Sequence, residues 1–320
     1  MTNTTLLVAH DPTARHLALL ERLPPGLRIL ASDTAQGLRP AAAEAQVLLA
    51  SPSAKPVIEQ LWPDLKRLEW IHALSAGLEG LLFPALVESP VVLTNSAGVF
   101  ARSLAEFALA GMLYFAKDLA RMKRQQAARD WTCFDVEELR HRTLGIIGFG
   151  GIGRETAARA RAFGMRIHAM RRTAPQPDPL VDQWYTAAEL DMLVTGADYL
   201  LISAPLTPET RCLIDARRLA LLAPHAVVIN VGRGPVVEEA PLIDALSSGR
   251  IRGAVLDVYD TEPLPAAHPF WAMDNVLLSP HTADHTATWL DEAMEFFLAN
   301  FERWSTGQPL HNVTRKHDGY

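Results

Sequence analysis

The stretch from Thr143 to Gly164, TLGIIGFGGIGRETAARARAFG, decides the fold of this chain. It begins with an apolar run and ends in an alanine-rich segment, and its centre has glycines at 148, 150 and 153 in the arrangement G-x-G-x-x-G. Three glycines at this spacing are weak evidence alone. A strand before them and a helix after them provide the setting of a dinucleotide-binding turn. The stretch therefore predicts a strand–turn–helix unit that binds a dinucleotide.

Each glycine of this turn has its own physical task. Gly148 permits the tight turn, Gly150 lets a pyrophosphate approach the backbone, and Gly153 lets the helix pack closely on the strand. The N-terminus of the helix adds unpaired N–H groups and the positive end of its dipole. A glycine-rich turn without a ligand is the alternative.

The segment AMRRT, residues 169–173, lacks the carboxylate that normally follows such a turn. An acidic residue about 20 positions on binds the ribose hydroxyls of NAD. Here Arg171 and Arg172 stand at that place, followed by Thr173. The forked donors of arginine suit a phosphate, so the sequence predicts a preference for NADP. A solvated loop with two surface arginines is the alternative.

Short apolar runs alternate with helical patterns along the whole chain, which indicates βαβ units and parallel sheets. Residues 99–130 contain only one glycine and no proline, and they predict a single long helix that connects two domains. A further helix is expected at 18–23, one with a strand after it within 57–72, and one within 287–313. The other strands are expected at 5–10, 27–32, 45–51, 91–98, 143–150, 166–170, 198–205, 226–232, 253–259 and 275–280.

Composition excludes several classes of protein. A chain of 320 residues accommodates two domains, and its formal charge of −6 argues against general binding of nucleic acid. Cys133 and Cys212 do not lie in a metal-spaced cluster, so we expect buried or inert thiols, no metal site and a reducing cytoplasm. The first residues do not resemble a signal peptide, and the longest apolar stretch, 104–116, is too short to span a membrane.

Four polar side chains follow successive predicted strands of the second half. Arg233 lies in INVGRGP, Asp257 and Glu262 lie in LDVYDTEPLP, and His281 lies in LLSPHTADH. The carboxyl ends of parallel strands meet at one edge of a sheet, so these side chains are expected to share a crevice. Arg233 can grip the carboxylate and carbonyl oxygen of a 2-keto acid. His281 can donate a proton, Glu262 can hold the imidazole and raise its pKa, and Asp257 can face the nicotinamide.

With these motifs, the chain resembles the D-isomer-specific 2-hydroxyacid dehydrogenase family over nearly its whole length. The stretches TLGIIGFGGIGRETA, APLTPETR and INVGRGPVVEEAPLIDAL carry the resemblance, together with AVLDVYDTEPLPAAHPFW and NVLLSPHTA. It implies that Arg233, Glu262 and His281 are catalytic. It also implies that the backbone of Ser75, Ala76 and Gly77 binds the substrate carboxylate, and that Arg233 and His281 contact the substrate too. The residues expected at the cofactor are Leu104, Gly148, Gly150, Gly151, Ile152, Gly153, Arg154, Arg171, Arg172, Thr173, Pro205, Thr210, Val231, Gly232, Asp257 and Ala283.

The family resemblance also implies an architecture. The expected fold is α/β, with two doubly wound parallel-sheet domains. A flavodoxin-like substrate domain would comprise 1–98 and 286–320, and an inserted Rossmann cofactor domain would comprise 99–285. The long helix after Gly98 would form much of a homodimer interface.

The expected activity is reduction of a small 2-keto acid of the glyoxylate, hydroxypyruvate or phenylpyruvate type to the D-2-hydroxy acid, and the reverse oxidation. The chain looks most like the NADPH-preferring glyoxylate/hydroxypyruvate reductase branch, with NAD as the alternative cofactor. Two other hypotheses remain. One is a nucleotide-sensing, corepressor-like protein on the same fold. The other is an NADH-using dehydrogenase of a different hydroxy acid. We expect no regulatory extension after residue 320. This expectation argues against phosphoglycerate dehydrogenase and against a tail that binds partner proteins.

Overall fold

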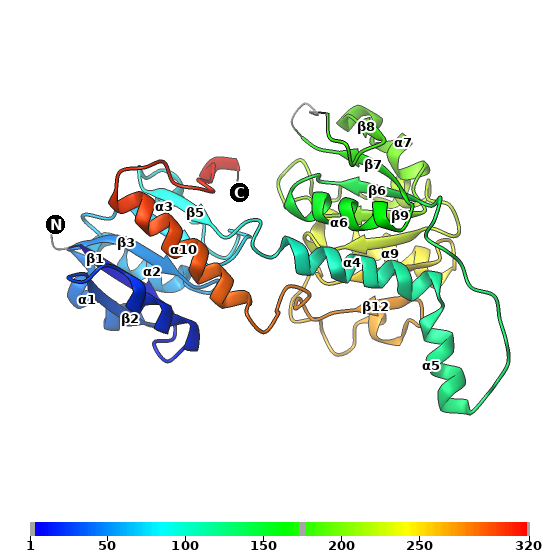
Figure 1. Cartoon of the computed structure of the whole chain (residues 1–320), viewed down its shortest axis with the longest axis horizontal. Coiled ribbons are helices and arrows are strands. Elements are labelled where there is room, and N and C mark those ends of the chain that lie inside the picture. The colour runs from blue at the N-terminus through cyan, green and yellow to red at the C-terminus, as the bar shows by residue number, and fades with distance from the viewer. Residues whose placement is uncertain (1–3, 173–176, 319–320) are drawn as a thin grey trace. The chain divides into compact units, whose positions relative to one another are not determined.

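The computed structural model of the chain describes residues 4–172 and 177–318 and consists of two compact units (Figure 1). The first unit comprises Met1–Phe100 and Ala287–Tyr320, and the second comprises Ala101–Thr286. Each contains one parallel sheet. Across the described residues, no helix combines the length and the apolar character that a membrane crossing requires.

The first unit is built on a five-stranded parallel sheet in the order β2-β1-β3-β4-β5, which is the flavodoxin-like order. Strands β1 and β4 are buried at every position, as expected where both faces of a sheet are covered. The strands are β1 (Thr5–Ala9), β2 (Arg28–Ser32), β3 (Ala45–Ala50), β4 (Trp70–Ala73) and β5 (Val92–Asn95).

The C-terminal part of the chain completes this first unit. Phe297 of helix α10 is fully buried and stacks on Trp70 of β4, with ring centroids 5.5 Å apart. Val313 then forms an antiparallel bridge with Thr94. The helix predicted at 18–23 is instead a 3-10 helix that begins at Arg15. The helices are η1 (Arg15–Arg22), α1 (Ala35–Ala42), α2 (Lys55–Leu61), η2 (Trp62–Asp64), α3 (Pro84–Val87), α10 (Trp289–Ser305) and η6 (Lys316–Asp318).

The second unit contains a seven-stranded parallel sheet in the order β12-β11-β10-β9-β6-β7-β8. The order of the parallel strands reverses between β6 and β9, which is the arrangement of the Rossmann fold. The predicted fold class is therefore confirmed. The sequence missed β8, a three-residue edge strand with one buried side chain. The strands are β6 (Thr143–Ile147), β7 (Arg166–Met170), β8 (Gln183–Tyr185), β9 (Tyr199–Ile202), β10 (Val227–Asn230), β11 (Gly253–Leu256) and β12 (Val276–Leu278).

Helices pack on this second sheet at close range. A Cβ at Gly111 of helix α4 would lie only 2.7 Å from Val255 Cγ2, so glycine at this position lets α4 approach β11. The helices are α4 (Ala101–Ala116), α5 (Leu119–Ala128), α6 (Gly151–Ala162), η3 (Ala187–Glu189), α7 (Leu190–Thr195), α8 (Ala216–Leu219), η4 (Gly234–Val236), α9 (Glu239–Ser247) and η5 (Pro269–Ala272).

The prediction of one continuous helix over 99–130 is wrong. The helix breaks after Ala116, and Asp118 adopts a left-handed conformation with φ 48° and ψ 52°. The Asp118 side chain accepts a hydrogen bond from the backbone N–H of Arg121 and so caps α5. An aspartate tolerates this conformation and prefers a cap to a helix interior, so it divides the pattern into α4 and α5.

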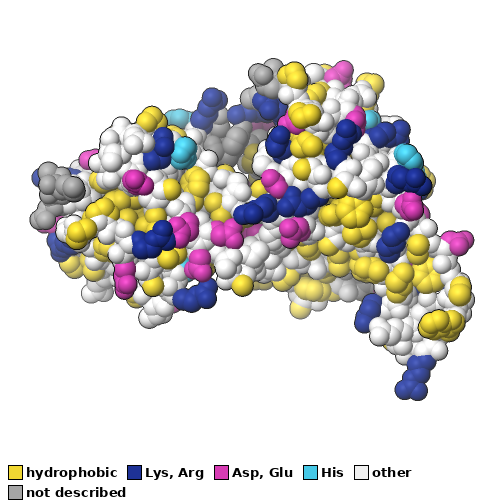
Figure 2. Space-filling model, viewed as in Figure 1, with side chains coloured by type: hydrophobic (Ala, Val, Ile, Leu, Met, Phe, Trp, Pro, Cys, Tyr) yellow, Lys and Arg dark blue, Asp and Glu magenta, His cyan; other side chains and the backbone are white. Residues whose placement is uncertain are grey.

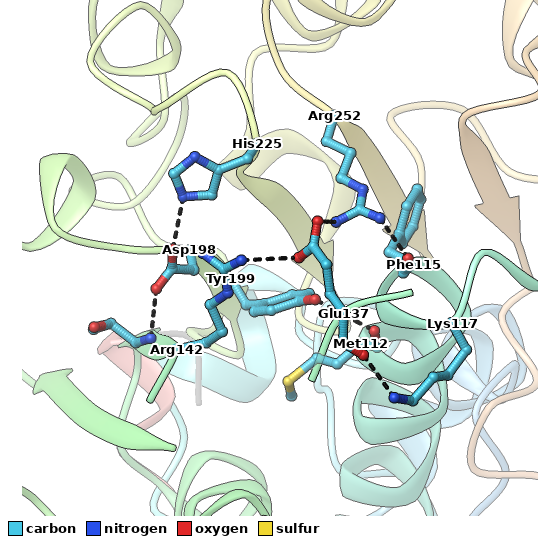
Figure 3. A network of polar contacts seen from close by, with 10 residues as sticks. Met112, Phe115, Lys117, Glu137, Arg142, Asp198, Tyr199, His225 and Arg252 are labelled. Atoms are coloured by element: carbon cyan, nitrogen blue, oxygen red, sulfur yellow. Dashed lines mark hydrogen bonds and ion pairs between the residues drawn. The ribbon is translucent and has the colours of Figure 1, made fainter. Parts of the chain in front are cut away.

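A polar network at the amino-terminal edge of the second sheet holds the broken helix in place (Figure 3). The carboxylate of Glu137 contacts Arg142 at 3.1 Å and Arg252 at 3.0 Å. Arg252 also donates to the carbonyl of Phe115, and the N–H of Glu137 donates to that of Ala116. The segment after α5 thus closes the end of α4, where helix carbonyls need outside donors.

Of the two alternatives for the cysteines, buried or inert thiols, the first is wrong. Cys133 and Cys212 are both exposed, rather than buried. Each lies in a segment between regular elements, where local sequence gives no measure of burial.

Candidate active site

The candidate residues of the second unit lie after the carboxyl ends of its strands. Gly148 follows β6, Arg171 follows β7, Arg233 follows β10 and His281 follows β12. This is the edge where open α/β sheets bind ligands. The network around Glu137 occupies the opposite edge, because Arg142 and Arg252 directly precede strands.

The glycine turn has the close packing that its sequence predicts. Gly148 has a φ of 94°, and a Cβ there would lie 2.6 Å from the backbone nitrogen of Ala204. A Cβ at Gly153 would lie 2.7 Å from the carbonyl oxygen of Gly148, so helix α6 sits directly against the turn. In contrast, a Cβ at Gly150 would have no atom within 4 Å. The backbone is therefore open at Gly150 and crowded at the other two glycines.

This opening fits a dinucleotide. The N–H groups at the start of α6, at Gly151, Ile152 and Gly153, have no acceptor within the helix, and they begin directly beyond Gly150. Donors of this kind suit the oxygens of a pyrophosphate. The turn thus has both the space and the donors that the group requires.

The two arginines after β7 lie beside the glycine turn. The carbonyl of Met170 accepts hydrogen bonds from the N–H groups of Gly148 at 2.9 Å and Phe149 at 3.2 Å. Arg171 is the next residue, and Arg172 is exposed. The pKa of Glu209 is lowered mainly by a hydrogen bond from Thr207, and the Arg172 charge contributes. Thr173, the third residue expected here, lies outside the described residues.

Two further predicted cofactor residues form part of one loop. Thr210 donates from its hydroxyl to the carbonyl of Pro205 at 2.7 Å and also accepts from the N–H of Thr207. The loop after β9 is therefore closed on itself. Arg154 on α6 pairs with Asp178 at 3.0 Å. The side chain of Leu104 is buried in α4.

The backbone around Arg233 is held by an asparagine that sequence reasoning missed. Asn230 at the end of β10 donates to the carbonyl of Arg233 at 3.0 Å and accepts from the N–H of Gly232 at 3.1 Å. Arg233 in turn donates to the carbonyl of Gly232 at 2.7 Å. Val231 and Gly232 are buried, whereas the Arg233 side chain is half-buried. An asparagine that ends an apolar strand is the signal that could have identified this support.

His281 and Glu262 form the closest charged contact of the site. Nδ1 of His281 lies 2.6 Å from Oε2 of Glu262, and the other carboxylate oxygen accepts from the N–H of Tyr259 at 2.9 Å. The His281 side chain is 42% exposed and therefore accessible. The sequence missed the contribution of Tyr259, because a backbone donor leaves no sequence signal.

This contact raises the pKa of His281 and lowers the pKa of Glu262, and both shifts favour the charged pair. The hydrogen bond that His281 donates to Glu262 raises the pKa of His281, although burial and the charge of Arg233 oppose the rise. Burial raises the pKa of Glu262, but the hydrogen bonds from His281 and Tyr259 outweigh it, so this pKa lies below its usual value. His281 is thereby suited to hold a proton near neutral pH.

Asp257 has a different environment from Glu262. It is 1% exposed, and its Oδ1 accepts from the N–H groups of Thr282 at 3.0 Å and Ala283 at 3.1 Å. The carboxylate therefore fixes the loop that carries His281. The carbonyl of Ala283 also accepts from Ser103 of α4 at 2.6 Å.

The predicted substrate loop lies in the first unit, directly after β4. Asn95 donates to the carbonyl of Ala76 at 2.6 Å, and Ser75 donates to the carbonyl of Gly77 at 2.7 Å. Among the described residues, the backbone N–H groups of Ser75, Ala76 and Gly77 have no hydrogen-bond acceptor. The loop thus presents three consecutive donors with its carbonyls fixed.

A Rossmann-order sheet with this glycine turn and a histidine–carboxylate pair at its carboxyl edge defines a dinucleotide-dependent oxidoreductase. Residues 109–283 match the family model described as "D-isomer specific 2-hydroxyacid dehydrogenase, NAD binding domain". The chain belongs to this family.

Relatives and solved structures agree with this assignment. The chain is 33% identical to glyoxylate/hydroxypyruvate reductase B of Escherichia fergusonii over 84% of this chain and 85% of that one. It is 32% identical to glyoxylate/hydroxypyruvate reductase A of Serratia proteamaculans, over 79% and 82%. A D-isomer specific 2-hydroxyacid dehydrogenase from Xanthobacter autotrophicus, solved with NADPH and MES, matches with a TM-score of 0.84. It is 29% identical and covers 99% of both chains.

Proposed function

We propose that this protein reduces small 2-keto acids, of the glyoxylate or hydroxypyruvate type, to D-2-hydroxy acids with NADPH. The observation that carries the proposal is the 2.6 Å contact between His281 and Glu262, on the same strand edge as Arg233 and the open glycine turn. The names of the relatives from Escherichia fergusonii and Serratia proteamaculans support the substrate class.

In this proposal, His281 is the acid. Glu262 occupies Nδ1, so Nε2 is the nitrogen that gives a proton to the carbonyl oxygen as that oxygen gains charge. Glu262 holds the ring in one orientation and keeps the imidazolium stable. In the reverse direction the same nitrogen takes the proton back from the hydroxyl group.

Arg233 and the loop at 75–77 bind the substrate. Arg233 grips the carbonyl oxygen and the carboxylate with its planar donors, which orients the keto carbon. The three backbone N–H groups of the loop bind the carboxylate, as the family resemblance implies. Neither group needs to change its protonation state during the reaction.

The cofactor would be held by the turn at Gly148–Gly153, with Pro205 and Thr210 on the next loop and Asp257 toward the carboxamide. The residues fit this group because Gly150 is open and α6 begins beside it. When bound, the reduced nicotinamide supplies the hydride. The chain itself positions the keto acid and moves the proton.

The preference for NADPH rests on Arg171 and Arg172. They directly follow Met170, whose carbonyl is bound to the glycine turn, and positive charge there attracts a 2′-phosphate. Glu209 lies close enough to Arg172 for that charge to contribute to its lowered pKa. The NADPH complex of the Xanthobacter autotrophicus relative supports the same preference.

A panel of 2-keto acids tests the function. Purified protein is mixed with NADPH or NADH and with glyoxylate, hydroxypyruvate, phenylpyruvate or phosphohydroxypyruvate, and the loss of absorbance at the nicotinamide band is followed. Turnover with the small acids and a higher kcat/KM with NADPH are expected. Nucleotide binding without turnover on any acid would contradict the proposal and favour a nucleotide-sensing protein.

The proposal includes a homodimer. Helix α5 has no buried residue, and hydrophobic side chains gather on it and on the segment that follows (Figure 2). These are Leu119, Met122, Val136 and Trp131, the last of which is 95% exposed. An apolar surface of this kind is typical of an interface between protein chains. The cytoplasmic location stays a prediction.

A further inference from the structure

His72 is a fully buried histidine at the end of β4, directly before the loop at 75–77. Its ring stacks on Phe296 of α10, and burial lowers its pKa to about 3. The ring is therefore neutral. Both of its nitrogens lie close to hydroxyl groups, with Nδ1 at 2.7 Å from Thr94 Oγ1 and Nε2 at 3.3 Å from Ser96 Oγ.

One arrangement of the hydrogens satisfies every polar atom around the ring. The indole nitrogen of Trp70 can only donate, and it donates to Thr94 Oγ1 at 2.8 Å. Thr94 has a single hydroxyl hydrogen, and it gives this hydrogen to Nδ1 of His72. The proton of the neutral ring is then on Nε2, which donates to Ser96. Ser96 gives its own hydrogen to the carbonyl of Ala73 at 3.1 Å.

The chain of side-chain hydrogen bonds ends at the Ala73 carbonyl at the end of β4, and its last member, Ser96, also holds the candidate substrate loop through its backbone. Besides the bond from its hydroxyl to Ala73, Ser96 donates from its N–H to the carbonyl of Ser75 at 3.0 Å. The adjacent Asn95 donates to the carbonyl of Ala76. These bonds fix the peptide planes at Ala73, Ser75 and Ala76. Because a carbonyl and the following N–H belong to one rigid plane, they also fix the N–H groups of Ala76 and Gly77.

We propose that His72 and Ser96 are positioning residues: their side-chain contacts hold Ser96 so that its backbone N–H aims the N–H of Ala76 at the substrate carboxylate, while Asn95 aims the N–H of Gly77. The inference rests on the proposed function, because it takes the loop as the carboxylate site. The hydrogen-bond chain sets the orientation of the loop before substrate arrives, so less ordering is needed on binding.

Two single variants test the inference. Ser96→Ala removes only a hydroxyl and keeps the fold, whereas His72→Phe keeps a flat ring but removes both nitrogens. Each is expected to raise KM for the keto acid about tenfold, with a much smaller change in kcat, because a misaligned donor binds the substrate carboxylate more weakly in the ground state and the transition state alike. The dissociation constant for NADPH should stay unchanged.

Controls separate positioning from general destabilisation. His72→Gln retains an amide donor at the place of Nε2 and should restore most of the lost affinity. His16→Phe replaces another buried histidine of the same unit, and in the described part of the chain the Nε2 of His16 has no hydrogen-bond partner. This control should leave KM unchanged.

The outcomes distinguish the two proposals. If the unaltered protein turns over keto acids and both variants keep KM within twofold, the inference is overturned and the function stands. If the unaltered protein reduces no keto acid, the proposed function fails. The inference is then decided by crystal structures of the Ser96→Ala and His72→Phe variants. A displaced backbone at 74–78 would support it, and an unmoved loop would overturn it.

Discussion

Oε2 of Glu262 lies 2.6 Å from Nδ1 of His281, so a carboxylate after β11 and an imidazole after β12 act as one unit. The contact decides which ring nitrogen is available, because Nδ1 is occupied. It also raises the pKa of His281, so that the protonated ring persists to higher pH. The proposed proton donor is therefore Nε2.

Replacement of His281 tests the acid. His281→Gln should lower kcat for keto acid reduction by on the order of 10²–10⁴-fold, since that is the usual contribution of a general acid. NADPH affinity, measured by fluorescence titration, should change little. A variant with unchanged turnover would show that another group supplies the proton.

The pH profile tests the role of Glu262. Reduction needs protonated His281, so kcat should fall as pH rises through the pKa of this residue. Glu262→Gln removes the main cause of the raised pKa, and the fall should move to lower pH. Glu239→Gln is the matched control, because Glu239 contacts His268 at 3.1 Å in the same unit. Superimposable profiles for Glu262→Gln and the unaltered protein would argue against the assignment.

Two glycine variants separate folding from nucleotide binding. Gly148→Ala combines a φ of 94° with a Cβ only 2.6 Å from the Ala204 nitrogen, so it should lower the free energy of unfolding by at least about 1–3 kcal/mol. A Cβ at Gly150 would have no atom within 4 Å, so Gly150→Ala should have the same free energy of unfolding as the unaltered protein. Its methyl group would instead block a pyrophosphate and weaken NADPH binding. Thermal unfolding and nucleotide titration of both variants provide the measurement, and tight NADPH binding by Gly150→Ala would refute the assigned position.

Cofactor preference tests the arginine pair. The double variant Arg171→Ala/Arg172→Ala should raise KM for NADPH by about 10- to 100-fold, because the free energy of charge-assisted hydrogen bonds corresponds to a change of that size. KM for NADH should change little, and Arg171→Asp should shift the preference toward NADH. Arg140→Ala, at an exposed arginine paired with Glu138, is the control. Equal loss for both cofactors would reduce the pair to general surface charge.

The proposed dimer depends on an exposed tryptophan. Trp131→Ser should raise the dissociation constant of the dimer about tenfold or more, because large buried aromatic side chains dominate interfaces. Analytical ultracentrifugation over a range of concentrations measures this constant. Trp271→Ser, at another exposed tryptophan of the same unit, is the control. A monomer for the unaltered protein would contradict the dimer.

Much of the fold could be predicted from local pattern. The apolar runs around Ile146 and Ile229 are buried strands, and the glycine spacing places the turn between β6 and α6. Errors arose where one residue outweighs a pattern. Asp118 interrupts an otherwise helical stretch, because its left-handed backbone and capping side chain are local preferences that hydrophobic periodicity does not register.

The candidate site was predictable in its residue types but not in its supports. His281, Glu262 and Arg233 stand at strand ends with side chains of recognisable chemistry. Asn230 and Tyr259 support them through backbone contacts. Such contacts depend on which loops meet in space, and Tyr259 acts through a backbone donor that leaves no signal in the sequence.

The sequence by itself determined that a dinucleotide turn is present and which charged groups follow the strands, because glycine spacing and strand-end position are local properties. Tertiary structure alone decided that Glu262 meets His281 at Nδ1 and that Asp257 binds the loop of His281. It also placed the neutral ring of His72 between Thr94 and Ser96. These partners are distant in the chain, and a hydrogen bond requires atoms within about 3 Å of one another, a distance that only the packed sheets establish.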